Sequence, residues 1–182
     1  MKKAGTFLNR NILVWMLLCI LVGLNRTGPA LAQAARKWPQ AIKPRTWAFP
    51  RDHGAHPEYR TEWWYFTGNL SDDAKHQYGY QLTFFRQGVR AKVDDPASSW
   101  AIRDLYFAHF TITDVKSNQF RMAECLSRAG PGLAGARNDR MEVWIFNWFA
   151  KMNDSVMYLK AKKDDLELKL ELRSRKPLVF HG

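Results

Sequence analysis

The segment from Phe49 to Leu70 places side chains suited to acid–base chemistry beside a run of large aromatic rings. It reads FPRDHGAHPEYRTEWWYFTGNL, in which Glu62 directly precedes Trp63 and Trp64. Burial against apolar rings disfavours the charged form of a carboxyl group, so a carboxyl in such a place can stay protonated and donate a proton. The segment therefore predicts the wall of a pocket that is apolar along its length and charged at one point.

Three residues of this segment are candidates for catalysis. Glu62 is the candidate proton donor, and Asp52 and His53 are candidates for positioning a water molecule. The structural alternative for Glu62 is an ion pair with Arg60 or Arg51, which lie in the same segment. Residue types and spacing leave both interpretations open.

The same segment offers weak support for a metal site. His53 and His56 are followed by Glu58, but they lie in a loop containing Gly and Pro, and their spacing matches no zinc motif. No Ser lies in a nucleophile elbow, so the sequence contains no hydrolase triad of that kind. We therefore predict neither a metal site nor a cofactor.

Alternating hydrophobicity predicts strands along the rest of the chain. Between Leu166 and Leu172 every second residue is Leu, with charged residues between them, as in a strand that buries one face. Short turns rich in Asp, Asn, Gly and Ser separate such runs. The predicted strands are 62–70, 78–85, 105–113, 119–126, 141–151, 155–162 and 165–173, and 130–139 is the one long loop. This pattern predicts an all-β, antiparallel fold closed into a barrel or sandwich.

Aromatic side chains in these strands point to both faces. One face is expected to fill a barrel or to line a cavity for an elongated apolar ligand, and the alternative is that the rings simply fill a wide core. His109 is expected to be an interior histidine that has hydrogen-bond partners. The candidate ligand-binding residues are Trp63, Trp64, Tyr65, Tyr80, Phe84, His109 and Trp144.

The first 32 residues have the features of a secretory signal peptide. Lys2, Lys3 and Arg10 precede the uncharged apolar run 12–24, and Ala30-Leu31-Ala32 is a small-x-small cleavage site. We therefore predict cleavage near Ala32 and export to the periplasm or the cell exterior. An uncleaved N-terminal anchor is the alternative.

The distribution of charge and the number of cysteines argue against nucleic acid as a partner and against an internal disulfide. The first 32 residues carry four basic and no acidic side chains, so their removal lowers the formal net charge of +11 by four, to +7. The remaining basic residues alternate with acidic ones and form no basic stripe, which argues against nucleic acid as a partner. Cleavage would leave Cys125 as the only cysteine, so the exported domain would have no internal disulfide.

Three stretches together resemble one known family. They are the segment 49–70 quoted above, YGYQLTFFRQGV at 78–89 and WAIRDLYFAHFTITD at 100–114. They resemble the lipocalin-like secreted proteins that include the carotenoid 1,2-hydratases (hydroxyneurosporene synthases) and the AttH-type proteins. The resemblance implies two lipocalin-like β-barrels in tandem, of which this chain would be the N-terminal one, in a truncated form. The expected organisation is a signal peptide (1–32), an extended N-terminal arm (33–48) and a lipocalin-like barrel (49–182).

Three functions are consistent with these features. We favour an exported lipocalin-like protein that binds a hydrophobic small molecule, such as a lipid or an isoprenoid. The first alternative, implied by the resemblance, is a hydratase that adds water to an isoprenoid alkene by carboxylic-acid protonation. The second is an accessory protein of a membrane transport or export system. The sequence does not predict the oligomeric state.

Overall fold

The computed structural model describes residues 38–91, 98, 100–177 and 179. The predicted signal peptide (1–32) and the first residues of the predicted arm (33–37) lie outside this part. Within the part that is described, no helix is long and apolar enough to cross a membrane.

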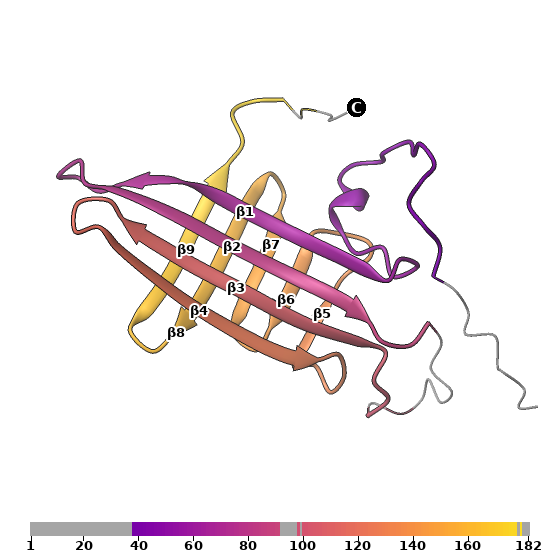
Figure 1. The fold of residues 1–182 in the computed structure, drawn as a ribbon. Helices are drawn as coiled ribbons and strands as arrows, with labels where there is room; N and C mark the ends of the chain where they lie inside the picture. Colours follow the sequence, from indigo (N-terminus) through magenta and orange to yellow (C-terminus); the bar gives the residue numbers. More distant parts are fainter. Residues whose placement is uncertain (1–37, 92–97, 99, 178, 180–182) are drawn as a thin grey trace, which may run out of the picture. The chain divides into compact units, whose positions relative to one another are not determined.

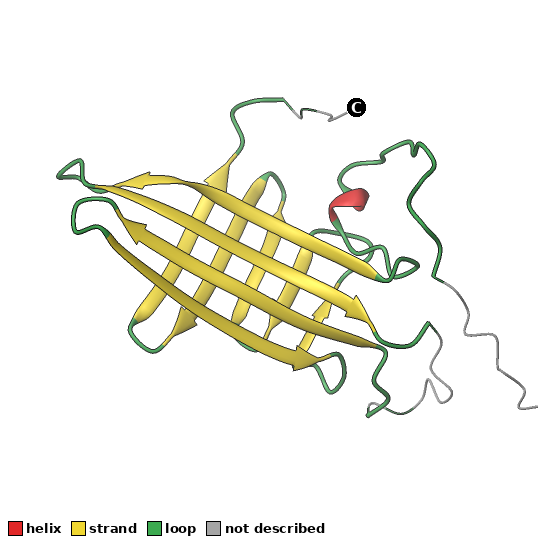
Figure 2. Ribbon diagram, in the orientation of Figure 1, coloured by secondary structure: helices red, strands yellow, loops and turns green. Residues whose placement is uncertain are grey.

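The described chain forms nine strands and one short 3-10 helix (Figures 1 and 2). All neighbouring strands pair antiparallel, in one sheet of order β1-β2-β3-β4 and a second of order β5-β6-β7-β8-β9. Figure 1 shows the strands of one sheet crossing those of the other. The elements are η1 (Arg51–His53), β1 (Thr61–Ser71), β2 (Gln77–Gly88), β3 (Asp104–Asp114), β4 (Gln119–Arg128), β5 (Ala134–Ala136), β6 (Glu142–Ile145), β7 (Trp148–Asn153), β8 (Val156–Lys163) and β9 (Leu166–Arg173).

The all-β, antiparallel class predicted from the alternation is confirmed, but the barrel is not closed. In the described residues no ladder joins β4 to β5 or β9 to β1. The two sheets instead pack face to face, as in a sandwich.

The space between the sheets is filled by side chains from both of them. The ring of Phe110 on β3 meets that of Trp148 on β7 edge-to-face, with centroids 6.0 Å apart. The indole Nε1 of Trp148 donates a hydrogen bond to the carbonyl of Lys162 at 2.7 Å, so its polar group is satisfied within the core. The core residues with no exposed surface are Leu82, Phe84, Ala108, Phe110, Val143, Ile145, Ala150 and Ala161.

The prediction of one strand over 141–151 is wrong. The chain turns between β6 and β7, where Phe146 adopts a φ of 54° and its N–H bonds to the carbonyl of Leu133. A left-handed backbone is uncommon for an aromatic residue, and the turn-forming residue in the run, Asn147 directly after Phe146, was not taken into account.

The predicted long loop 130–139 contains a strand that the sequence analysis did not predict. β5 pairs with β6, and Gly135 lies opposite Trp144. A Cβ atom on Gly135 would lie 2.7 Å from the Trp144 ring, so a residue with a side chain fits there only if that ring moves. Its small residues, Ala-Gly-Ala, carry no alternation that a sequence pattern could detect.

The polar turns were predicted correctly. Asn118, Asp154 and Asp164 have φ values of 52°, 52° and 54° in the turns after β3, β7 and β8. Asn and Asp tolerate this backbone conformation better than other residues with a side chain, so their presence between two alternating runs indicates a hairpin turn.

Truncation of a core ring should destabilise the domain strongly. Phe84 has no exposed surface, so Phe84→Ala should lower the free energy of unfolding by about 3–5 kcal/mol through lost burial and a cavity. Urea unfolding measures this change. The matched control is Phe120→Ala, which removes the same ring at a site 64% exposed and should cost less than about 1 kcal/mol. Equal losses for the two variants would contradict the assignment of the core.

Candidate functional site

The segment that connects η1 to β1 is anchored to both sheets. The indole Nε1 of Trp64 on β1 donates to the carbonyl of His53 at 3.2 Å. The N–H of Ala55 donates to the carbonyl of Arg137, beyond β5, at 2.7 Å. A Cβ atom on Gly54 would lie 2.8 Å from that same carbonyl oxygen, so a glycine permits the close approach of the two backbones. These contacts fix the loop that carries the site.

Asp52 in η1 is a buried carboxylate that holds the N-terminal arm. It accepts hydrogen bonds from the N–H of Ala48 at 2.5 Å, from Arg45 at 2.8 Å and from Arg51 at 3.1 Å. The hydrogen bond from Ala48, with help from the two arginines, lowers the pKa of Asp52 from 3.8 to about 2. Asp52 is therefore charged at neutral pH and joins the arm to η1.

His56 lies between two carboxylates. Its Nδ1 is 2.6 Å from Oε1 of Glu62, and its Nε2 is 3.5 Å from Oδ1 of Asp52. Its backbone N–H also donates to both carboxylate oxygens of Glu62, at 3.0 and 2.9 Å. An imidazolium ring satisfies both side-chain contacts, because each of its nitrogens carries a proton.

Arg86 on β2 completes this cluster from the buried side. Its side chain is 1% exposed and lies 3.4 Å from Glu62 and 3.0 Å from Asp104, on β3. Its Nη2 donates to the carbonyls of His56 and Tyr59 at 3.0 and 2.8 Å. We call the cluster the Arg86 network; it consists of Asp52, His56, Glu62, Arg86 and Asp104. No buried side-chain nitrogen or oxygen in the described chain lacks a hydrogen-bond partner.

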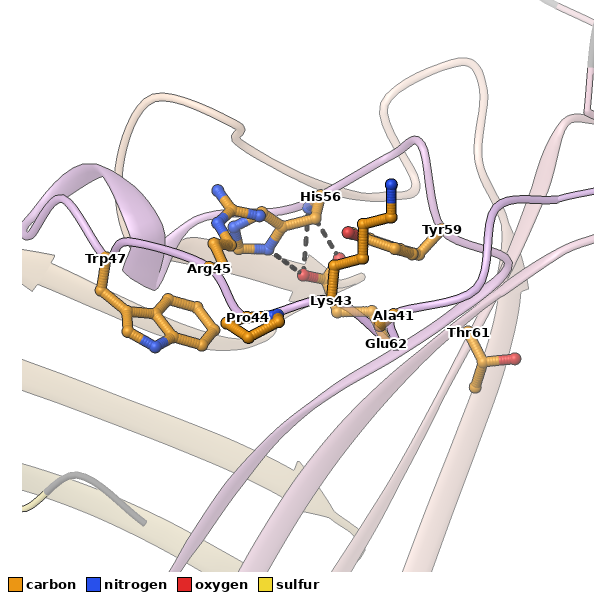
Figure 3. A pocket seen from close by; sticks show the side chains of 9 residues that line it. All are labelled: Ala41, Lys43, Pro44, Arg45, Trp47, His56, Tyr59, Thr61 and Glu62. Atoms are coloured by element: carbon orange, nitrogen blue, oxygen red, sulfur yellow. Dashed lines mark hydrogen bonds and ion pairs between the residues drawn. The ribbon is translucent and has the colours of Figure 1, made fainter. Parts of the chain in front are cut away.

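A pocket of about 470 Å³ opens beside this network. Figure 3 shows Trp47 at one end of the pocket and Thr61 at the other, with the Glu62 carboxylate beneath His56. Most of the wall comes from the N-terminal arm, so the pocket exists only where the arm crosses the start of β1. The lining residues are Ala41, Lys43, Pro44, Arg45, Trp47, His56, Tyr59, Thr61 and Glu62.

The cations of the pocket differ in their partners. Arg45 pairs with Asp52, lies 3.8 Å from Glu58 and places its guanidinium over the Trp47 ring at 5.4 Å. Lys43 forms no ion pair with any described residue. The pocket therefore combines an apolar wall, a carboxylate–histidine pair and one unpaired ammonium group.

The structure brings together two of the three predicted catalytic residues. Asp52 and Glu62 both contact His56, whereas no contact joins His53 to Glu62 in the described chain. The ring of His53 instead packs on Phe49, with centroids 4.4 Å apart, and burial lowers the pKa of His53. The catalytic roles of all three stay predictions.

The predicted ion partners of Glu62 were wrong. Neither Arg60 nor Arg51 pairs with it, and its described partners are His56 and Arg86. Alternation along β2 offered a signal for the second of these. Arg86 continues the inward-facing series of that strand, and a buried arginine requires acidic or carbonyl partners. His56 was considered only as a metal ligand, although the described residues contain no group of three or more side chains that could hold a metal ion.

The predicted ligand-binding residues lie on three surfaces, and none of them lines the pocket. One group lies in the core between the two sheets, a second lies on the outer face of the first sheet, and one residue lies on the second sheet. The core residues are Trp64, Tyr80 and Phe84, the outer-face residues are Trp63, Tyr65 and His109, and Trp144 is on β6. Their role in binding stays a prediction.

The expected interior position of His109 is not observed. Its side chain is half-buried on the outer face of the first sheet, beside the rings of Phe85 and Phe107 at 5.4 and 5.8 Å. The alternation of β3 is as predicted, but the aromatic residues on both faces concealed which face is inside.

Removal of the Arg86 side-chain charge should destabilise the domain more than removal of a surface charge. Arg86→Met leaves Glu62 and Asp104 without their buried cation, so we expect a loss of about 3–5 kcal/mol in the free energy of unfolding. The control is Arg121→Met, which breaks the exposed pair with Asp165 and should cost less than about 1 kcal/mol. Denaturant unfolding compares them, and similar losses would show that the Arg86 pairs contribute no more than surface ones.

The contribution of Asp52 should depend on pH in a defined direction. The pKa of Asp52 lies near 2 in the folded protein, below its ordinary value of 3.8, so its charge stabilises the fold above about pH 4. This stabilisation is lost as the pH falls toward 2. Asp52→Asn should therefore be less stable than the wild type at neutral pH, and the gap between their free energies of unfolding should become smaller in acid.

Urea unfolding of both proteins over a pH series measures this gap. Asp139→Asn is the control, since Asp139 is an exposed carboxylate in a surface pair with Arg140. A gap for Asp52→Asn that stays constant down to pH 2 would contradict the assignment.

Comparisons with known proteins fit this architecture. The AttH-like family matches residues 40–182. The crystal structure of an AttH candidate from Nitrosomonas europaea is similar, with 28% sequence identity and a TM-score of 0.66. The match covers 79% of this chain and 42% of that one, so this chain spans less than half the length of that protein. None of the curated proteins compared with this chain matches it. Because the family match extends over most of its length, the chain belongs to the AttH-like family.

Proposed function

We propose that the domain binds an apolar ligand of the lipid or isoprenoid class in the pocket beneath the N-terminal arm. The observation that carries this proposal is the pocket of about 470 Å³ with His56 and Glu62 in its wall. A concave site with mainly apolar walls and a few polar groups is the usual form of a small-molecule site. Export of the domain, from the predicted signal peptide, is part of the proposal.

The position of the pocket favours binding at the edge of the sheets. Side chains of both sheets, such as Phe110 and Trp148, meet in the space between them. The arm, by contrast, leaves a hollow above β1. The ligand of this proposal therefore lies under the arm.

The chemistry of the wall favours a ligand with one polar end. Trp47 and Pro44 can pack against an apolar body, and the His56–Glu62 pair can exchange hydrogen bonds with a hydroxyl or carbonyl group. The unpaired ammonium of Lys43 favours a carboxylate at that end. A fatty acid or an oxidised isoprenoid has this combination.

The short contact between His56 and Glu62 supports hydration of an isoprenoid alkene as a second candidate. In that reaction the proton of the pair would add to the less substituted alkene carbon, and water would capture the resulting tertiary cation and return a proton to the pair. The separation of 2.6 Å between Nδ1 and Oε1 permits proton exchange between the two residues. The Glu62 carboxylate accepts hydrogen bonds from His56 and Arg86. It could therefore donate a proton to the alkene only after it had received one from the His56 ring.

A bulky residue in the pocket wall should block binding. We expect Ala41→Trp to weaken binding of cis-parinaric acid, a fluorescent polyene fatty acid, at least ~10-fold, because the indole occupies the pocket. The fluorescence of the probe, excited directly in its own absorption band, measures the affinity independently of the tryptophans. The matched control is Ala74→Trp in the exposed turn between β1 and β2, which should bind as the wild type does. Unchanged binding by Ala41→Trp, or equal loss in the control, would overturn this placement of the ligand.

The two candidate functions are separated by Glu62→Gln. The natural ligand is identified by solvent extraction of the purified protein and mass spectrometry. A binding protein should retain that ligand in the Glu62→Gln variant, since a neutral amide still fits the site. If the protein is a hydratase, the wild type should convert the extracted alkene to the alcohol, and the Glu62→Gln variant should lose this turnover.

A further inference from the structure

The outer face of the first sheet carries an apolar row that runs across all four strands. The register places Trp63 opposite Phe85, Phe85 opposite Phe107, and Phe107 opposite Leu126. The two ends are well exposed, at 62% for Trp63 and 64% for Leu126. Contiguous apolar surface of this kind marks an interaction site more often than a free surface. We call these four residues the outer row.

Ring geometry within the outer row argues against a planar ligand. Phe85 and Phe107 stack on each other, with centroids 4.6 Å apart and an interplanar angle of 11°. One face of each ring is therefore covered by the other ring, and the opposite faces are directed along the row toward Trp63 and Leu126. Such a surface suits packing against other side chains.

Two opposite charges flank the outer row on β4. Glu124 lies in the register position on one side of Leu126, and Arg128 lies on the other side. Four residues of a strand span about 13 Å, so the two side chains are placed too far apart to pair directly with each other. The Glu124 side chain is exposed and forms no ion pair among the described residues, although Lys163 Nζ donates to its backbone carbonyl at 3.1 Å. The Arg128 guanidinium donates to the carbonyl of Trp100 at 3.0 Å and lies over the Trp100 ring, and it forms no ion pair with a described residue.

This arrangement is complementary to itself. A second copy, turned by a two-fold axis that runs along the outer row, would place its row on this one. The same rotation exchanges the two sides of the row, so Glu124 would face the partner's Arg128, and Arg128 would face the partner's Glu124. An interface of this isologous type repeats each contact twice.

We propose that the chain forms a symmetric dimer through the outer row, with Glu124 and Arg128 forming two ion pairs between the copies. Apolar rings in the centre and opposite charges at the rim are the usual composition of a protein interface. None of the four residues of the outer row lines the ligand pocket, so this inference does not depend on the proposed function.

Charge reversal tests the pairing directly. Sedimentation equilibrium of the full chain should show a dimer in the wild type. Glu124→Arg or Arg128→Glu alone should raise the dimer dissociation constant at least ~10-fold, because each places like charges opposite each other. The double variant restores opposite charges and should return the constant to within ~3-fold of the wild type.

A second pair of variants tests the outer row. Leu126→Glu should abolish the dimer, while Val115→Glu, at an apolar site 58% exposed in the turn after β3, should leave it unchanged. Circular dichroism and thermal unfolding establish that each variant is folded. A wild type that is monomeric at every concentration would overturn the proposal. So would a dimer that survives Leu126→Glu, single reversals without effect, or a monomer that binds anionic lipid vesicles through this face.

Discussion

The site depends on the need to pair one buried charge. Arg86 lies near the end of an otherwise apolar strand face, and its guanidinium is almost fully removed from water. A buried cation is tolerated only with acidic or carbonyl partners around it. Those partners come from β1, β3 and the loop before β1, so the pairing of Arg86 fixes that loop against the sheet.

The pocket follows from the same pairing. Because the carbonyl of His56 is held by Arg86, the His56 ring reaches both Glu62 and Asp52. Asp52 in turn binds Arg45 and the backbone of the arm, which forms the other wall. The apolar surface available to a ligand is thus created by a chain of charged contacts.

The sequence predicted the fold better than the site. Alternation identified β1 to β4, β8 and β9, because each buries one face and ends at a polar turn. It failed at Phe146, where an aromatic residue makes the turn, and at β5, which has no alternation. In the site, composition indicated Asp52 and Glu62. Arg86, the partner of Glu62, and Lys43, which lines the pocket, were missed, because their positions depend on register and on the path of the arm, which no local pattern encodes.

The pair formed by Glu62 and Arg86 also specifies how β1 is placed. Trp63 and Trp64 are equal in apolar area, so the two indoles alone do not distinguish the faces of this strand, although Phe66 and Leu70 favour the observed one. A shift of β1 by one residue would bring Trp63 inside and turn Glu62 outward. Arg86 would then lose a buried carboxylate, which costs far more than the exchange of one indole for another. The ion pair and the packing of Phe66 and Leu70 therefore keep Trp64 inside, where its indole binds the carbonyl of His53 in η1, and leave Trp63 on the outer row.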